Sequence, residues 1–193
     1  MNISAVLLVG GASRRMHKDK ATLVIRNKPL WQIQLDLLQK LRPAEIFVSA
    51  RTDPSWRPHH VQFVADDPPS RGPLSGLTAT LARIQSNHLL ALAIDMPFMY
   101  EGHLRALCMQ IRPACGVLPM VGGRVEPVAA IYPVEARIEF IKALSGTNFS
   151  LQTLTNRLVK MGRLHVIRVS KREQRFYWNL NEPSDLAASL AAD

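Results

Sequence analysis

Residues Ile3–Val9 form a nearly continuous run of apolar side chains, and this run ends at Gly10-Gly11. Such a run is typical of a strand that is buried on both faces of a parallel sheet. Parallel strands need a crossover between them, usually a helix, before the next strand can pair. This feature therefore favours a parallel sheet covered by helices on both faces.

The rest of the chain alternates between short apolar runs and segments with helical periodicity. The predicted strands are Ile3–Val9, Glu45–Ala50, Val61–Ala65, Leu89–Ile94, Gly116–Met120, Val125–Ile131 and Leu164–Val169. The predicted helices are Lys28–Leu41, Gly72–Gln85, Tyr100–Ile111, Pro133–Leu144, Leu151–Lys160 and Pro183–Ala191. This order predicts an α/β protein, a three-layer α/β/α sandwich around a mostly parallel sheet.

Length and composition exclude several classes of protein. With 193 residues, 47% of them hydrophobic, the chain is expected to form a single domain over residues 1–193 and not a disordered or collagen-like structure. No apolar stretch approaches the roughly 20 residues that a membrane helix needs. The apolar N-terminal run precedes its basic residues, the reverse of a signal peptide, and Cys108 and Cys115 are too few for a disulfide framework. A cytoplasmic protein is expected.

The net charge of +9 predicts an anionic partner. The charge is concentrated in two segments, Arg14–Lys28 and Arg157–Arg175, each of which contains a single acidic residue. Neither segment shows a clear nucleic-acid recognition module, so nucleic acid is disfavoured. A phosphorylated small molecule is the partner that the composition favours.

The segment Gly10–Lys20 has the composition of a phosphate-binding loop. Its two glycines let the backbone approach a phosphate, and Arg15 and Lys20 supply positive charge. It matches neither the P-loop nor the dinucleotide-binding pattern. The alternative is a Gly-Gly turn followed by a solvated basic stretch.

Leu8-Val-Gly-Gly-Ala-Ser-Arg-Arg-Met-His-Lys-Asp-Lys20 resembles the L-A-G-G-x-x-x-R-M-G-x-D-K signature of the molybdenum cofactor guanylyltransferase family of nucleotidyltransferases. Further segments of the family follow in the same order along nearly the whole chain. They are Lys28–Trp31, Asp66, Gly72–Leu77, Asp95–Pro97, Gly123–Pro127 with Ala130–Tyr132, and Asn179–Asp185. Two positions depart from the pattern, because His17 replaces a Gly and Ser49 stands where the family often has an Asn near the guanine base.

The resemblance implies a Rossmann-like sheet of the nucleotide-diphospho-sugar transferase type. It implies transfer of GMP from GTP to the terminal phosphate of molybdenum-molybdopterin, with Mg²⁺ as cofactor and pyrophosphate as the leaving product. GTP and molybdopterin are then the partners, and transient contact with cofactor-inserting proteins or apo-molybdoenzymes is left open. Two anions must meet in this reaction, so positioning and charge neutralisation would carry the catalysis.

The resemblance also assigns roles to individual residues. Arg15, Lys20 and Asp95 are the expected catalytic residues, with Asp95 as the metal ligand. The expected ligand-binding residues are Leu8, Val9, Gly10, Gly11, Lys20, Ser49, Asp66, Asp95, Asn179 and Asn181. Glu126 is expected on the acceptor side with the two asparagines.

Each role has a simpler structural alternative. Asp95 could instead cap a helix, and Lys20 and Arg15 could be surface cations. Gly72 and Gly76 are expected either to pack a helix closely against the nucleotide loop or merely to begin it. The Trp and Met residues are expected in the core.

Two other functions stay open at this point. One is transfer of CMP to the same pterin, or of a nucleotide to another small phosphate, by a related enzyme. The other is a non-catalytic protein that binds a nucleotide and escorts the cofactor. Leu8-Val-Gly-Gly11 resembles the guanylyl form of the family more than the cytidylyl form, and the presence of both Asp95 and Lys20 favours an enzyme over an escort.

Overall fold

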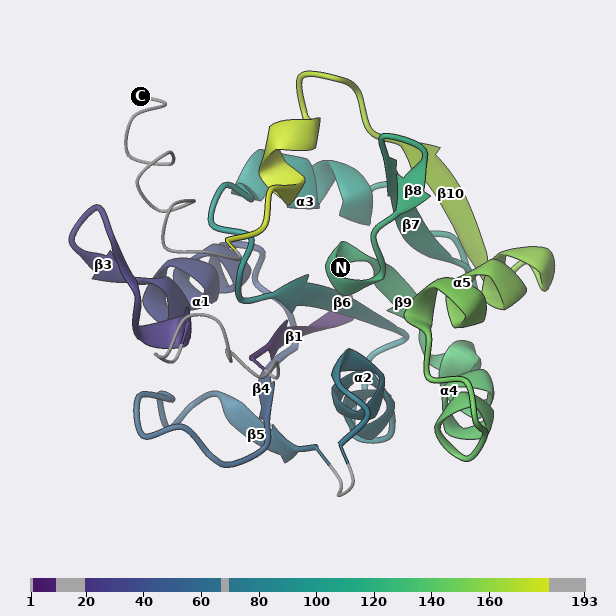
Figure 1. The fold of residues 1–193 in the computed structure, drawn as a ribbon, viewed down its shortest axis with the longest axis horizontal. Helices are drawn as coiled ribbons and strands as arrows, with labels where there is room; N and C mark the ends of the chain where they lie inside the picture. The colour runs from purple at the N-terminus through teal and green to yellow at the C-terminus, as the bar shows by residue number, and fades with distance from the viewer. Residues whose placement is uncertain (1, 10–19, 67–69, 181–193) are drawn as a thin grey trace.

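A computed structural model describes residues 2–9, 20–66 and 70–180 (Figure 1). These residues contain an eight-stranded sheet in the order β10-β7-β9-β6-β1-β4-β5, with β8 paired to β7. The strands are β1 Ile3–Leu8, β4 Glu45–Ala50, β5 Gln62–Ala65, β6 His88–Ala93, β7 Gly116–Val121, β8 Arg124–Val125, β9 Ile131–Pro133 and β10 Leu164–Arg168. A separate two-stranded hairpin consists of β2 Val24–Ile25 and β3 Lys28–Pro29.

The sheet is mostly parallel, as predicted. β1 pairs in parallel with β4 and β6, β4 with β5, and β10 with β7. β9 is antiparallel to both of its neighbours, β6 and β7, and β8 is antiparallel to β7. The carboxyl ends of β1, β4, β5 and β6 therefore meet at one edge of the sheet, which is where α/β proteins bind ligands.

Helices cover both faces of the sheet, so the predicted three-layer sandwich is confirmed. α1 (Leu30–Lys40) and α3 (Glu101–Cys108) pack in one apolar cluster, and α2 (Pro73–Leu81), α4 (Arg137–Leu144) and α5 (Leu151–Lys160) pack in the other. Successive residues of β1 belong to different clusters, because side chains alternate between the two faces of a strand. Leu7 belongs to the first cluster and Leu8 to the second.

Four short 3₁₀ helices complete the described structure: η1 Lys20–Thr22, η2 Pro127–Ala129, η3 Val134–Ala136 and η4 Gln174–Tyr177. Among the described residues, every helix is too short or not apolar enough to cross a lipid bilayer. The predicted helix Pro183–Ala191 lies outside the described residues.

The prediction of one strand over Val125–Ile131 is wrong. The chain instead leaves β8 at Val125, turns through η2, and begins β9 at Ile131. Pro127 explains the break, since proline has no N–H for a sheet hydrogen bond and suits the first turn of a helix. The buried hydroxyl of Tyr132 donates to the Pro127 carbonyl at 2.6 Å and holds this turn in place.

The expectation that Trp and Met residues lie in the core is also wrong in part. Met96 and Met99 are buried, but Met109 and Met161 are among the most exposed large apolar residues described. Trp31 and Trp56 stack on each other with ring centroids 5.2 Å apart, and both are partly buried. Trp178 is 42% exposed, and its neighbours place it beside the candidate active site.

Candidate active site

The candidate site lies where four neighbouring strands end. Backbone hydrogen bonds continue past the strand ends: Val9 N–H donates to Ser49, Ile94 N–H to Leu8, and Asp66 N–H to Ala50. The residues predicted from sequence at these ends, which are Leu8, Val9, Ser49, Asp66 and Asp95, are thus carried on adjacent strands or directly after them. The parallel register brings them to one edge of the sheet.

Asp95 and Lys20 form the charged centre of this edge. Lys20 Nζ lies 3.4 Å from Asp95 Oδ2, and the two side chains are 17% and 24% exposed. Lys20 Nζ also donates to the carbonyl of Leu180 at 2.7 Å, and the Leu180 N–H donates to the Asp95 carbonyl at 2.9 Å. The segment that follows η4 therefore fixes both residues. A partly buried cation beside a carboxylate can bind a phosphate group and a metal ion together.

Ser49 and Asp66 form a second, buried polar group on the β4–β5 side. The Ser49 hydroxyl donates to Asp66 Oδ1 at 2.9 Å, and the Ser70 hydroxyl donates to Oδ2 at 3.2 Å. Each carboxylate oxygen has a second lone pair, so Asp66 can still accept a hydrogen bond from a ligand.

Gly76 in α2 packs directly on this pair. A Cβ atom at that position would lie 2.2 Å from Ser49 Oγ and 3.1 Å from Asp66 Oδ1. Only glycine allows this approach of α2 to the strand ends. Gly72, which precedes α2, has a positive φ of 65°, a conformation that glycine also adopts most easily. Both glycines thus have a structural requirement beyond a plain helix start.

Glu126 lies between β8 and η2, within electrostatic range of Asp95. Burial raises the pKa of its carboxyl group above 4.5, and the charge of Asp95 raises it further, while a hydrogen bond from the Val128 N–H acts against the shift. A partly desolvated carboxylate that faces a second one favours a cation or a hydrogen-bond donor nearby.

Asn179 has a buried side-chain oxygen that finds no hydrogen-bond partner among the described residues. It lies one residue before Leu180, so it is close to the Lys20–Asp95 pair. Buried polar atoms are nearly always paired. An unpartnered amide oxygen at this place is what a site awaiting a hydrogen-bond donor would show.

A cluster around His103 anchors the segment that carries Asn179 and Leu180. His103 Nε2 lies 2.7 Å from the Tyr177 hydroxyl, and His103 Nδ1 lies 3.4 Å from Glu173 Oε1. Burial lowers the pKa of His103, and the Glu173 charge opposes this shift. Tyr177 is the last residue of η4 and Glu173 precedes it, whereas His103 belongs to α3. This cluster therefore joins η4 to α3.

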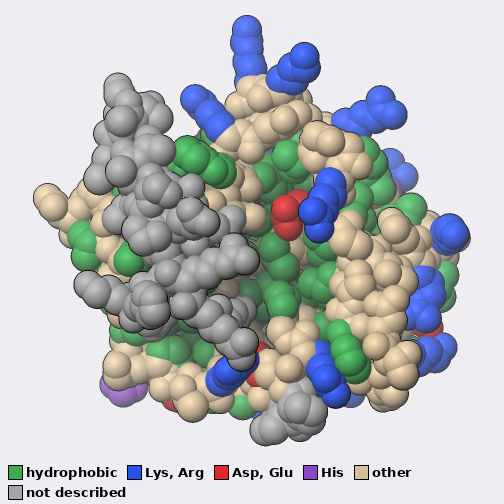
Figure 2. Space-filling model, viewed as in Figure 1, with side chains coloured by type: hydrophobic (Ala, Val, Ile, Leu, Met, Phe, Trp, Pro, Cys, Tyr) green, Lys and Arg blue, Asp and Glu red, His purple; other side chains and the backbone are tan. Residues whose placement is uncertain are grey.

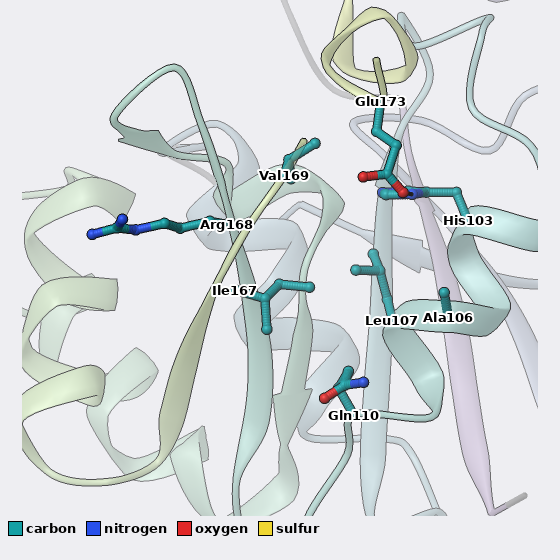
Figure 3. A pocket seen from close by; sticks show the side chains of 8 residues that line it. All are labelled: His103, Ala106, Leu107, Gln110, Ile167, Arg168, Val169 and Glu173. Carbon is teal, nitrogen blue, oxygen red and sulfur yellow. Dashed lines mark ion pairs between the residues drawn. The ribbon is translucent and has the colours of Figure 1, made fainter. Parts of the chain in front are cut away.

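A cavity of about 330 Å³ opens between α3 and β10, next to the His103 cluster (Figure 3). Its lining residues are His103, Ala106, Leu107, Gln110, Ile167, Arg168, Val169 and Glu173. His103 and Glu173 face each other at one end, and Arg168 points away from the other side chains (Figure 3). Its walls combine apolar and polar side chains, and it contains none of the residues predicted for catalysis.

Several predicted site residues lie outside the described part of the chain. These are Gly10, Gly11, Arg15 and Asn181. Among the described ones, the structure brings Lys20 and Asp95 together and joins Ser49 to Asp66. Lys and Arg side chains project along the upper, right and lower edges of the face shown in Figure 2, which agrees with an anionic ligand.

Sequence reasoning missed Leu180 and Trp178 as parts of this site. Leu180 acts through its backbone, so its residue type gives no signal. Trp178 could have been noticed from its place beside Asn179, in a segment with three consecutive aromatic residues.

Comparison with known proteins identifies the family. The profile of the MobA-like NTP transferase domain matches residues 5–161, which is most of the chain. The chain belongs to the MobA-like NTP transferase family. It is a nucleotidyltransferase, and the resemblance found in the sequence is confirmed.

Relatives within the MobA-like family are named for molybdenum cofactor biosynthesis. A probable molybdenum cofactor guanylyltransferase of Opitutus terrae is 30% identical over 189 residues, which cover 95% of this chain and 92% of that protein. The molybdenum cofactor guanylyltransferase of Cereibacter sphaeroides is 29% identical, with 97% and 95% covered. The similarity thus extends well beyond the single phosphate-loop motif.

Solved structures share the fold of this MobA-like chain. Molybdopterin-guanine dinucleotide biosynthesis protein A of Archaeoglobus fulgidus superimposes with a TM-score of 0.75 at 22% identity, covering 97% of this chain and 96% of that one. A 2-C-methyl-D-erythritol 4-phosphate cytidylyltransferase of Thermus thermophilus gives 0.69 at 15% identity, with both chains fully covered. At these identities the likeness shows the fold alone, a Rossmann-like nucleotidyltransferase sheet.

Proposed function

We propose that this nucleotidyltransferase transfers GMP from GTP to the terminal phosphate of molybdenum-molybdopterin. The products are the molybdopterin guanine dinucleotide cofactor and pyrophosphate. The observation that carries the proposal is the Lys20–Asp95 pair, which lies at the same sheet edge as the Ser49–Asp66 group and contacts Leu180, the residue after Asn179 with its unpartnered Oδ1. Such a site combines a charged centre with separate polar groups that could recognise two different substrates. The names of the relatives support the choice of nucleotide and acceptor.

The reaction forms one P–O bond and breaks another. An oxygen of the acceptor phosphate attacks the α-phosphorus of GTP, and the bond to the β-phosphate breaks, so pyrophosphate leaves with the bonding electrons. Both reactants are anions, so Lys20 lowers their repulsion and helps to hold the triphosphate. The contact of Lys20 with Leu180 fixes the ammonium group before substrate arrives, which reduces the entropy lost in the reaction.

The donor set at Asp95 fits Mg²⁺. This ion is usually held by one or two carboxylates together with substrate phosphates and water, and Asp95 supplies a carboxylate at the strand end. The described residues contain no cluster of three or more His, Cys, Asp or Glu that would form a complete protein cage for a metal. A bound Mg²⁺ would neutralise phosphate charge, and Asp95 would hold it.

On the acceptor side, Glu126 and Asn179 are the polar groups that we assign to the pterin. A 2-amino-4-oxopteridine has ring and amino N–H groups, which are donors for a carboxylate and an amide oxygen. Asn181 belongs to the same assignment by sequence. On the donor side, Ser49, Asp66 and the ends of β1 are assigned to the guanine nucleotide.

The test is an assay of pyrophosphate release. The protein is incubated with Mg²⁺, molybdopterin and each labelled nucleoside triphosphate in turn, and the labelled dinucleotide is separated. Release with GTP that requires molybdopterin is expected. Release with CTP alone would support the cytidylyl alternative. Release with GTP and another phosphate acceptor, but not with molybdopterin, would reject the pterin acceptor, and the protein would then be a nucleotidyltransferase with a different acceptor.

A further inference from the structure

Two aromatic rings stack beside the candidate active site. The rings of Phe98 and Trp178 have centroids 5.6 Å apart and planes only 15° from parallel. Phe98 follows Asp95 by three positions, and Trp178 precedes Leu180 by two. Both rings are therefore attached to the short segments that the Asp95–Leu180 backbone contact joins.

Part of the stacked pair is exposed to solvent. Trp178 is 42% exposed although one of its faces rests on Phe98. A large aromatic ring held in a fixed orientation, with apolar surface left in contact with solvent, is a stacking surface for a planar ligand.

The position of the pair separates it from the nucleotide side of the site. Asp66 and Gly76 lie with β5 and α2 at one end of the molecule, whereas α3 and the yellow η4 lie at the other end (Figure 1). β6, which leads to Asp95, lies in the middle of the sheet, between β9 and β1, whereas β5 is an edge strand. A second heterocycle on the α3–η4 side would therefore lie across Asp95 from the base of the nucleotide.

Asn179 adds a hydrogen-bonding group next to Trp178. Its buried Oδ1 has no partner among the residues that the structure describes, and it can only accept a hydrogen bond. The ligand expected here thus combines a planar π system with an N–H donor at its edge. A 2-amino-4-oxopteridine has both features.

We propose that Trp178, supported by Phe98, is the stacking surface for the pterin ring of the acceptor. This inference rests on the proposed function, because that function supplies a pterin acceptor. Trp178 would be a specificity-determining residue, which orients the acceptor so that its phosphate reaches the Lys20–Asp95 pair. Removal of one stacked aromatic partner typically weakens binding by at least about fivefold.

The first experiment measures binding without turnover. The protein is titrated with neopterin, a free 2-amino-4-oxopteridine, and both the heat of binding and the tryptophan fluorescence are recorded. We expect quenching in the unaltered protein. We expect Trp178→Leu to weaken neopterin binding at least about fivefold, and Trp178→Phe to restore most of the affinity without the quenching.

The second experiment measures kinetics with the same variants. Trp178→Leu should raise KM for molybdopterin at least about fivefold and leave KM for GTP unchanged. Tyr100→Leu is the matched control, because Tyr100 is another exposed aromatic residue near η4, but it contacts Phe176 and His103 and not the stacked pair. It should change neither constant.

The outcomes separate this inference from the proposed function. Unchanged neopterin affinity and unchanged KM for molybdopterin in Trp178→Leu would overturn the inference, even if GMP transfer is confirmed. A rise in KM for GTP alone would also overturn it, because the stacked ring would then be guanine. Neopterin binding that quenches Trp178, in a protein that transfers no GMP, would support the stacking surface and reject the proposed function.

Discussion

Gly76 and Ser49 approach so closely that a Cβ atom on the glycine would lie 2.2 Å from the serine hydroxyl oxygen. This contact joins α2 to the end of β4, and Asp66 accepts its hydrogen bond from the same hydroxyl. The packing of one helix thus depends on the same atoms that we assign to nucleotide binding.

Gly76→Ala is therefore expected to lower the free energy of unfolding by about 1–3 kcal/mol, because the added methyl group must displace Ser49. It should also weaken GTP binding, since the Ser49–Asp66 hydrogen bond is disturbed. Urea unfolding and calorimetric titration with GTP measure the two effects. Gly146→Ala is the control, since its Cβ would meet atoms no closer than 3.4 Å. Equal stability of the two variants would contradict the close contact.

Lys20→Ala is expected to weaken GTP binding by at least about tenfold and to slow transfer, because a charge-assisted contact to the phosphates is lost. The measurements are a GTP titration and initial rates of pyrophosphate release. Lys142→Ala removes a lysine whose partner is Glu139 on α4, away from the strand ends, and should alter neither. Normal affinity and normal rate in Lys20→Ala would remove Lys20 from the site.

Asp95→Asn is expected to reduce Mg²⁺-dependent turnover by ~10²-fold or more, because a neutral amide is a poorer ligand for a hard cation. The backbone contact of residue 95 with Leu180 does not need the carboxylate, so the fold should persist. Turnover against Mg²⁺ concentration and a circular dichroism spectrum test both statements. Asp36→Asn, which loses only an exposed pair with Lys28, should behave as the unaltered protein. Activity close to normal in Asp95→Asn would exclude the metal assignment.

GTP is expected to be preferred over CTP and ATP by ~10²-fold or more in kcat/KM. A site with a carboxylate acceptor suits the N1–H and amino group of guanine, and the wrong base leaves buried polar groups unpaired. Because Ser49 replaces a longer amide, the preference should be weaker than in a relative with the full pattern. Competition assays with the three nucleotides give the ratios. A ratio of CTP to GTP near or above one would reject guanylyl selectivity.

Stability is expected to fall as the pH drops below about 6.5. Burial lowers the pKa values of His88, His103 and His165 from their usual 6.5. The unfolded chain therefore binds these protons first, and the folded state loses stability from pH 6.5 down to the lowered pKa values. The raised pKa of Glu126 acts in the opposite direction, from a starting value of 4.5.

Urea midpoints at pH 7.5 and pH 5.5 test this dependence. His103→Gln should reduce the difference between them, whereas a replacement of the exposed His59 by Gln should not. A midpoint that is the same at both pH values in the unaltered protein would contradict the prediction.

The parallel core could be predicted because each of its strands is a short apolar run that ends at a polar or glycine residue. β4 and α5 have the predicted boundaries, Glu45–Ala50 and Leu151–Lys160. The prediction failed after Val125, where the apolar residues continue but Pro127 forces a turn. Apolar periodicity alone does not distinguish a strand from a buried turn whose backbone is satisfied by a side chain such as Tyr132.

The site could be predicted where its residues follow strands, as Asp66 and Asp95 do. The sequence gives no sign of the contacts that join distant segments through backbone atoms, such as Leu180 with Lys20. The His103–Tyr177 contact was equally hidden, since neither residue type specifies the other. Such pairings depend on the packing of α3 and η4, which only the three-dimensional structure contains.

Lys20 and the carbonyl group that it contacts are 160 positions apart in the chain. Ribosomes add about 5–20 residues per second, so roughly 8–32 s pass between the synthesis of the two partners. During that interval the early strands β1, β4 and β5 can pair, and Lys20 can meet Asp95, but the contact of Lys20 with the Leu180 carbonyl cannot yet form. The contact between Lys20 and Leu180 is thus among the last contacts of the site to form on a growing chain. The full set of contacts around Lys20 therefore requires almost all of the described chain.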